Sequence, residues 1–185
     1  VQRSSATPPA ARTATTMPTP DFPGNSFGQG KNVPAIAMAH GIPYVATATV
    51  ADLHDLERKV RYAMSFHGAR YIHILVPCPL GWGAPSAKTI ELARLAHETG
   101  LFPVFEAEYG EVTNVSKIRR KQPVEKYLML QKRFAHLFGK KGNPEIVQRM
   151  QALADRNIAR YGLLGDEQGD DIPVPEQAEE RHHVI

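Results

Sequence analysis

The sequence predicts an α/β fold, an open and mostly parallel sheet with flanking helices, followed by a helical C-terminal extension. Segments rich in β-branched and aromatic residues alternate with helical patterns between residues 44 and 109, which is typical of parallel strands joined by helices. The 185-residue chain is 42% apolar and 22% charged, so it is long and apolar enough for one domain with its own core.

The first helix is expected over residues 33–40, between a capping Asn32 and Gly41. A strand follows over residues 44–50, and residues 52–66 form an amphipathic helix. The apolar stripe of that helix is Leu53, Leu56, Val60 and Met64.

Residues 71–76 form the most apolar run of the chain and are expected to be a buried strand that ends at Pro77. A helix over residues 87–99, capped by Ser86, comes next. A strand over residues 103–109 follows, with a hairpin return near residues 112–115. Glu106 and Glu108 alternate with apolar residues in that strand, which predicts one solvated face.

The last third of the chain does not continue the alternation of strands and helices. Residues 117–121 are a basic run interpreted as a solvated turn, or second as a docking patch. Helices are expected over residues 123–137 and 144–161. We therefore divide the chain into an irregular segment (1–31), an α/β region (32–116), the helical extension (117–165) and a mobile acidic tail (166–185).

Residues 1–31 are rich in Ser, Thr, Pro and Gly, and suit either a flexible tail or an ordered loop against a ligand. A compact domain rarely begins with so long an irregular segment, and the chain starts with valine. We expect it to be the C-terminal portion of a larger subunit. The run from Gly28 to Lys31 lacks the spacing of a phosphate-binding loop.

Composition excludes several classes. One cysteine rules out an intramolecular disulfide framework and suits the reducing cytoplasm, which is the expected location. No apolar run approaches the roughly 20 residues that span a bilayer, so no membrane association is expected. The net charge of +3 does not by itself indicate nucleic-acid binding.

Cys78, the only cysteine, follows the apolar strand and lies between two prolines. The carboxyl edge of a parallel sheet is where ligands bind, so a thiol held there on a stiff loop is a candidate site. Three roles stay open on the residues alone: inert packing, a nucleophile with His40 or His73 as its base, and a metal ligand whose partners lie elsewhere.

Several pieces resemble, in order and spacing, the β subunits of 2-oxoacid:ferredoxin oxidoreductases. The most distinctive is Pro77-Cys78-Pro79-Leu80-Gly81-Trp82. The others are residues 1–8, 30–34, 39–48, 88–93 and 121–128. The resemblance covers residues 1–138.

This resemblance implies a fold of the thiamine-diphosphate-binding type and an enzyme that oxidatively decarboxylates a 2-oxoacid, first of all pyruvate, to an acyl-coenzyme A and CO₂. Thiamine pyrophosphate with Mg²⁺ carries out the decarboxylation, and electrons leave through a 4Fe-4S cluster to ferredoxin. It implies that Cys78 is the fourth cluster cysteine. It also implies that the hydroxyl-rich start lines the cofactor, through Gln2, Ser4, Ser5 and Thr7.

The family's other cluster cysteines and its Gly-Asp-Gly metal–diphosphate motif are absent from this chain. The cofactors must be completed by the upstream remainder of the subunit. Expected partners are α-, γ- and δ-type subunits, coenzyme A, and ferredoxin or a flavin subunit. Alternatives are an aryl or branched-chain substrate such as phenylglyoxylate with NAD as final acceptor, and a non-catalytic α/β assembly module.

Overall fold

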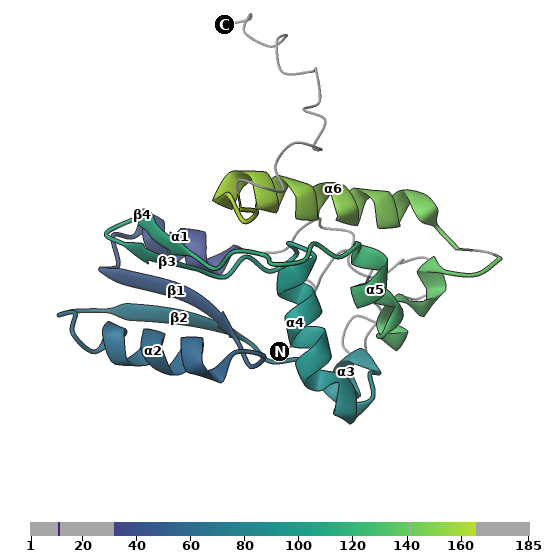
Figure 1. Ribbon diagram of the computed structural model, residues 1–185, viewed down its shortest axis with the longest axis horizontal. Helices are drawn as coiled ribbons and strands as arrows, with labels where there is room; N and C mark the ends of the chain where they lie inside the picture. Colours follow the sequence, from purple (N-terminus) through teal and green to yellow (C-terminus); the bar gives the residue numbers. More distant parts are fainter. Residues whose placement is uncertain (1–10, 12–31, 141, 166–185) are drawn as a thin grey trace, which may run out of the picture.

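The computed structural model describes residue 11, residues 32–140 and residues 142–165. Its sheet has four strands in the order β2-β1-β3-β4. The strands are β1 (Tyr44–Thr49), β2 (Arg70–Leu75), β3 (Phe105–Glu108) and β4 (Glu111–Val115). Figure 1 shows this sheet beside a group of helices, with one long helix running along both. The predicted α/β class is confirmed.

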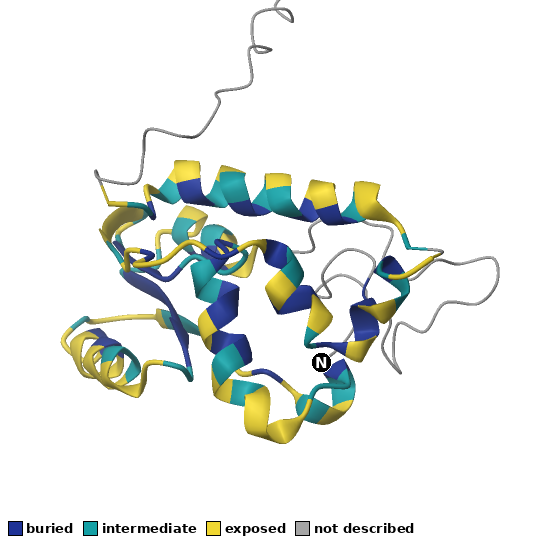
Figure 2. Cartoon of the chain, turned by 45° about the vertical axis from the view of Figure 1, so that its right-hand side comes forward, coloured by how far each residue is buried: buried dark blue, intermediate teal, exposed yellow. Residues whose placement is uncertain are grey.

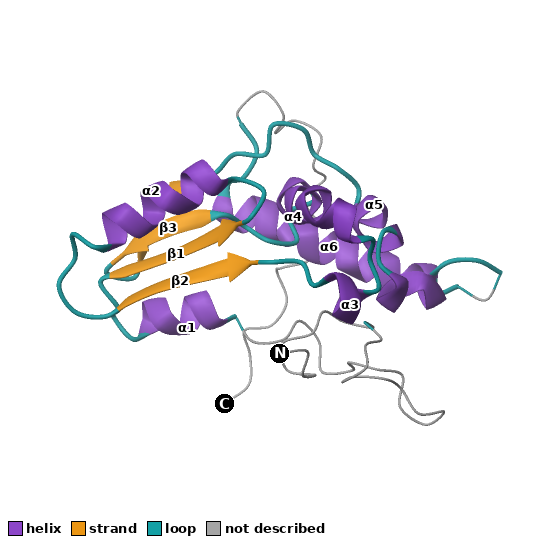
Figure 3. Ribbon diagram, turned by 90° about the horizontal axis from the view of Figure 1, so that it is seen from below, coloured by secondary structure: helices purple, strands orange, loops and turns teal. Residues whose placement is uncertain are grey.

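Two helices cover opposite faces of the sheet (Figure 3): α1 (Val33–Ala39) and α2 (Leu53–Ala63). Ala37 of α1 packs with Val45 of β1 on one face. Ala63 of α2 packs with Tyr44 on the other face. All residues of β1 are buried because the strand is central and covered on both faces.

The helix starts agree with the sequence. The Asn32 side chain accepts the N–H of Ala35, and the Asp52 side chain accepts the N–H of Asp55. These side chains satisfy donors that the first turn of a helix leaves without partners. Asn143 does the same for the long helix α6 (Pro144–Tyr161), which ends at Gly162.

The sheet is mixed rather than mostly parallel. β1 and β2 are parallel, but β3 pairs antiparallel with both β1 and β4. The helix before β3 packs among other helices instead of crossing back over the sheet, so the chain re-enters the sheet at the same edge at which β2 ends. Thr47 holds this entry, because its hydroxyl donates to Pro103 O at 2.7 Å and accepts from Phe105 N at 2.9 Å.

The helical group consists of α3 (Pro79–Trp82), η2 (Ser86–Lys88), α4 (Thr89–Glu98), α5 (Val124–Met129), η3 (Lys132–Leu137) and α6. All of these elements except η2 contribute residues to the largest apolar core of the described residues. Members of this core are Trp82, Leu92, Leu128, Phe134 and Met150. Ala11 is fully buried in the same core. The boundaries at residues 31, 116 and 165 stay predictions.

Two predicted helices are shorter than expected. The segment at 123–137 is broken, because Gln131 is extended and its buried amide donates to Tyr127 O at 2.6 Å. That break turns Arg133 and Phe134 into the core. Ser86 starts a 3₁₀ turn, and α4 begins only at Thr89, without a side-chain cap.

The predicted stripe of α2 does not face the sheet. Leu53 and Met64 are 66% and 68% exposed, and Val60 is also exposed. The buried residues of α2 are Lys59 and Ala63, and Figure 2 shows the helix mostly in the exposed colour. Sequence amphipathicity gives the apolar face of a helix but not the element that covers it.

The apolar strand at 71–76 is not buried either. It is β2, an edge strand of the described sheet, with Ile74 exposed and the residues around it half-buried. Val76, just beyond the strand, is exposed as well. An apolar edge of this kind is unusual unless another segment covers it.

The predicted solvated face of the third strand is wrong at Glu106, which is 3% exposed. Its carboxylate accepts hydrogen bonds from Tyr44, Arg58 and Asn114. Buried carboxylates need such partners, and alternation alone cannot show that a strand carries them.

The basic run at 117–121 is more than a solvated turn. Lys117 Nζ donates to Gly162 O at 2.6 Å, and Lys121 pairs with Asp155 at 2.9 Å. Ile118 between them is buried. The run therefore fastens the end of β4 to α6. The predicted tail at 166–185 lies outside the described residues.

Candidate functional site

Cys78 lies where the sequence predicts it, just beyond the carboxyl end of β2. Because β1 and β2 are parallel, their carboxyl ends share one edge of the sheet, where Val50 N donates to Leu75 O at 3.3 Å. The thiol is exposed. This is the edge at which open α/β sheets bind ligands.

A single helical turn holds the cysteine. Cys78 is the N-cap of α3, and its Sγ accepts the N–H of Gly81 at 3.4 Å. Its carbonyl accepts the N–H of Trp82 at 2.9 Å. Pro77 and Pro79 stiffen both sides of the residue. A backbone N–H directed at sulfur is the kind of hydrogen bond that sets the potential of an iron–sulfur cluster.

The α3 turn rests directly on η3. Gly83 ends α3 in the left-handed conformation with φ of 63°, and a Cβ built there would lie 2.7 Å from Lys132 Cβ. Gly83 O also accepts the N–H of Lys132 at 3.3 Å. A glycine is needed here for both the backbone conformation and the close approach.

Arg133 lies against the same turn. Its guanidinium carbon is 4.0 Å from the centroid of the Trp82 ring and 4.9 Å from that of Phe134. The residue is 3% exposed, and its Nε donates to the buried Gln131 amide oxygen at 2.8 Å. Neither Arg133 Nη2 nor Trp82 Nε1 finds an acceptor in the part of the chain that the structure describes.

Burial lowers the pKa of Arg133 to about 10. Electrostatic interactions with Tyr127 and with Cys78 oppose this shift. Arg133 therefore keeps its positive charge near pH 7, and its stacking on Trp82 places that charge against the turn that begins at Cys78. A buried charge with an unpaired N–H is costly unless an acceptor satisfies it.

The chemistry of this donor set fits a 4Fe-4S ligand. An exposed thiol, a backbone N–H at its sulfur and a buried cation close by suit an anionic cluster. Among residues 32–140 and 142–165, no group of three or more His, Cys, Asp or Glu side chains is placed to hold a metal ion. The described part thus offers one thiolate, and further ligands would come from elsewhere.

The histidines proposed as bases for a thiol nucleophile have other surroundings. His73 is half-buried, with its ring 5.7 Å from Phe102 and 6.1 Å from Tyr71, and burial lowers its pKa. His40 is exposed at the end of α1. The hydrogen bond that the structure shows at the thiol comes from Gly81 and not from an imidazole.

The predicted cofactor residues Gln2, Ser4, Ser5 and Thr7 lie outside the described residues, as does the run from Gly28 to Lys31. Ala11, four residues after Thr7, is described. It is buried in the core that also contains Trp82.

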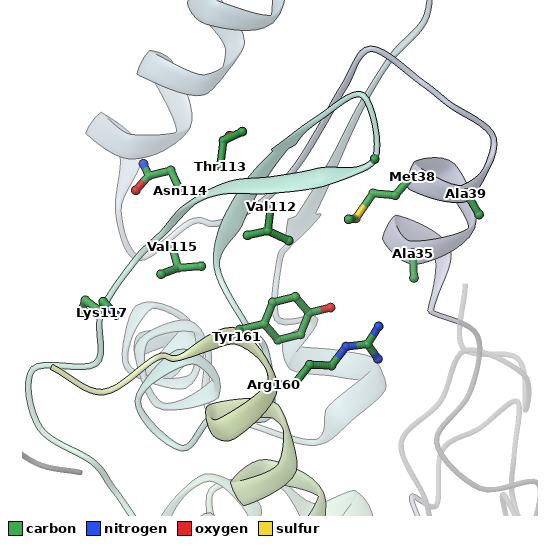
Figure 4. A pocket seen from close by; sticks show the side chains of 11 residues that line it. Ala35, Met38, Ala39, Val112, Thr113, Asn114, Val115, Lys117, Arg160 and Tyr161 are labelled. Atoms are coloured by element: carbon green, nitrogen blue, oxygen red, sulfur yellow. The ribbon is translucent and has the colours of Figure 1, made fainter. Parts of the chain in front are cut away.

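The structure also has an open groove of about 760 Å³ between α1, β4 and the end of α6. Figure 4 shows Arg160 and Tyr161 extending from α6 toward α1, with Met38 and Val112 nearby. None of the predicted site residues lines it. The groove and the cysteine loop are therefore separate features.

Similar proteins identify the family. The chain is 48% identical over 163 residues to pyruvate synthase subunit PorB of Methanosarcina barkeri, an alignment that covers 88% of this chain and 55% of that protein. It is 42% identical to pyruvate synthase subunit PorB of Methanocaldococcus jannaschii, covering 88% of this chain and 53% of that protein. The chain belongs to the β subunits of the 2-oxoacid:ferredoxin oxidoreductase family.

Within this family the chain is also similar to a subunit named for another substrate. It is 40% identical to ketoisovalerate oxidoreductase subunit VorB of Pyrococcus abyssi, over 80% of this chain and 48% of that protein. The chain spans about half the length of the curated relatives it matches. It matches no protein-family profile. No helix in the described ranges is both long enough and apolar enough to cross a membrane.

Sequence reasoning about this family member missed Arg133. The residue lies in a segment predicted as a continuous helix, where a basic side chain is expected to be solvated. Its neighbour Phe134 and the distant Trp82 gave no sign that the cation would lie between them and the core. Only the helix break at Gln131 places it there.

Proposed function

We propose that this chain is part of the catalytic β subunit of a 2-oxoacid:acceptor oxidoreductase, in which Cys78 is one thiolate ligand of a 4Fe-4S cluster. The observation that carries the proposal is the exposed thiol at the carboxyl edge of β1 and β2, held by a backbone N–H in a turn on which a buried cation stacks. Family membership supports it.

The reaction converts a 2-oxoacid and coenzyme A to acyl-coenzyme A and CO₂, with two electrons leaving one at a time to ferredoxin. Thiamine pyrophosphate with Mg²⁺, when bound, supplies the electron sink for decarboxylation. This chain's part is to hold one corner of the cluster on a stiff loop and to keep a positive charge beside it.

Gln2, Ser4, Ser5 and Thr7 are proposed as contacts to thiamine pyrophosphate. The buried position of Ala11 supports this for Thr7 first of all, because the four residues between them span at most about 14 Å, whereas the nine residues to Gln2 span at most about 32 Å. Ala11 itself lies in the core that contains Trp82, a residue of the turn that begins at Cys78.

Pyruvate is the first substrate proposed, since the relatives with the highest identity above are named pyruvate synthase subunits. A branched-chain 2-oxoacid is second, in line with the relative named for ketoisovalerate. An aryl substrate such as phenylglyoxylate, with NAD as final acceptor, stays an alternative. The cytoplasm is the proposed location, and the proposed partners are the remaining subunits, coenzyme A and ferredoxin.

The exposed stripe of α2 favours one candidate of a different class, a non-catalytic assembly module. The two proposals differ at Cys78. An assembly module needs no thiol there, whereas replacing a cluster thiolate should lower the iron content.

Replacing Cys78 by serine in the intact complex tests the proposal. We expect Cys78→Ser to lose about four iron atoms per subunit, together with the corresponding visible absorption and the electron paramagnetic resonance (EPR) signal of the reduced cluster. Ser86→Ala, on an exposed residue of a nearby turn, is the control and should keep all three. Unchanged iron and spectra in Cys78→Ser would favour the assembly module.

A further inference from the structure

A buried cation with an unpaired donor stacks on the turn that begins at Cys78, and the residues that the structure describes supply no acceptor for that donor. Arg133 is 3% exposed, and its Nη2 and the Nε1 of the stacked Trp82 have no acceptor among the described residues. Buried donors are seldom left unpaired. Two of them in one stacked pair indicate a group with acceptor atoms at this place.

The position of Arg133 and Trp82 indicates which kind of group supplies these acceptor atoms. Trp82 belongs to the turn whose N-cap is Cys78, and its backbone N–H donates to the Cys78 carbonyl at 2.9 Å. Arg133 stacks on the Trp82 ring at 4.0 Å. A guanidinium so placed acts on whatever negative charge the thiolate and its metal bring.

We infer that Arg133 is a charge-stabilising residue for the cluster bound through Cys78, and that it raises the reduction potential of that cluster. The inference rests on the proposed function. One electron enters the cluster when it is reduced, no bond to a ligand breaks, and the cluster with its thiolates becomes one unit more negative. The buried cation stabilises the more negative state more strongly than the oxidised one.

The low exposure of Arg133 makes this effect larger than that of a surface charge. Water and salt screen exposed charges, while a buried charge is screened much less. Arg149 on α6 provides the contrast, since its side chain is 75% exposed and pairs with Glu145. Its removal should leave the cluster unaffected.

The test is a dithionite titration of the intact complex, followed by the EPR signal and visible absorption of the cluster. In Arg133→Met, the equilibrium constant for one-electron reduction should fall three- to tenfold, and tenfold corresponds to 59 mV. Arg133→Lys keeps the charge and should stay within about twofold of the wild type. Arg149→Met is the control and should not change.

Either of two results would overturn this inference and leave the proposed function standing. The first is a folded, iron-replete Arg133→Met variant whose cluster has the wild-type reduction potential. The second is an equal shift of the reduction potential in Arg133→Met and Arg133→Lys, which would indicate a structural cause. If Arg133→Met does not assemble, Arg133→Gln replaces it under the same criteria. A cluster signal that survives in Cys78→Ser overturns the proposed function and this inference together.

Discussion

Glu106 is a single residue whose charge holds three elements together. Its carboxylate accepts the Tyr44 hydroxyl at 2.7 Å, Arg58 Nη2 at 2.6 Å and Asn114 Nδ2 at 2.8 Å, so β1, α2 and β4 all meet at it. Burial alone would raise the pKa of Glu106, but these hydrogen bonds outweigh it and lower the pKa below its ordinary value. The carboxylate is therefore charged in the folded chain.

We expect Glu106→Gln to lower the free energy of unfolding by about 1–3 kcal/mol at pH 7, because Arg58 loses its buried partner. A lowered folded pKa gives stability that is present above the unfolded pKa and lost as pH falls through the folded one. The difference in unfolding free energy between Glu106→Gln and the wild type should thus shrink as the pH falls below 4.5, the ordinary pKa of a glutamate.

Urea unfolding followed by circular dichroism at several pH values measures this difference. Glu57→Gln is the matched control, since Glu57 forms an exposed pair with Arg61, and such pairs contribute about 0–1 kcal/mol. A pH-independent difference for Glu106→Gln would mean that the lost interaction is not ionic.

At the scale of elements, the turn after α4 decides how the helical group meets α6. Gly100 has φ of +79°, and a Cβ there would lie 2.6 Å from Ile158 Cγ1 and 2.9 Å from Ala154 O. Asn157 Nδ2 donates to Gly100 O at 2.9 Å. The end of α4 therefore fits into a close contact on α6 that leaves no room for a side chain.

Gly100→Ala is expected to cost about 2–5 kcal/mol, from left-handed strain of about 1–2 kcal/mol together with overpacking of about 1–3 kcal/mol. Gly41→Ala is the matched control, because Gly41 has φ of +69° with nothing within 4 Å of its Cβ position. Gly41→Ala should lose only the stability that left-handed strain costs. Thermal or urea unfolding measures both, and equal losses would contradict the packing argument.

At the scale of the whole molecule, the chain consists of the sheet with α1 and α2 beside a helical group with the largest core (Figure 1). Cys78 lies at the start of the helical group, directly after the sheet edge. Ala11 enters this core from the start of the chain. The helical group thus links the cysteine loop with the segment proposed to contact the cofactor.

Ala11→Leu adds volume to a full core, and we expect a loss of about 1–3 kcal/mol in the free energy of unfolding. Because the proposed cofactor residues lie within ten residues of Ala11, the dissociation constant of thiamine pyrophosphate in the intact complex should also rise. Calorimetry measures both effects. Ala87→Leu, at an exposed alanine of η2, should change stability by less than about 0.5 kcal/mol.

Local signals in the sequence were reliable where short-range chemistry decides structure. The cap at Asn32 and the position of Cys78 directly after a strand follow from neighbouring residues and are confirmed. The direction of β3 and the exposure of the α2 stripe could not be derived in this way. They depend on which distant element each segment packs against.

The sequence by itself determined the α/β class, the place of Cys78 after an apolar strand and the family, because these depend on local propensity and on the order of motifs along the chain. Only the tertiary structure decided that the sheet is mixed, that Glu106 is buried and that Arg133 lies against Trp82. Each of these is a contact between segments far apart in sequence, whose partners periodicity and propensity do not specify.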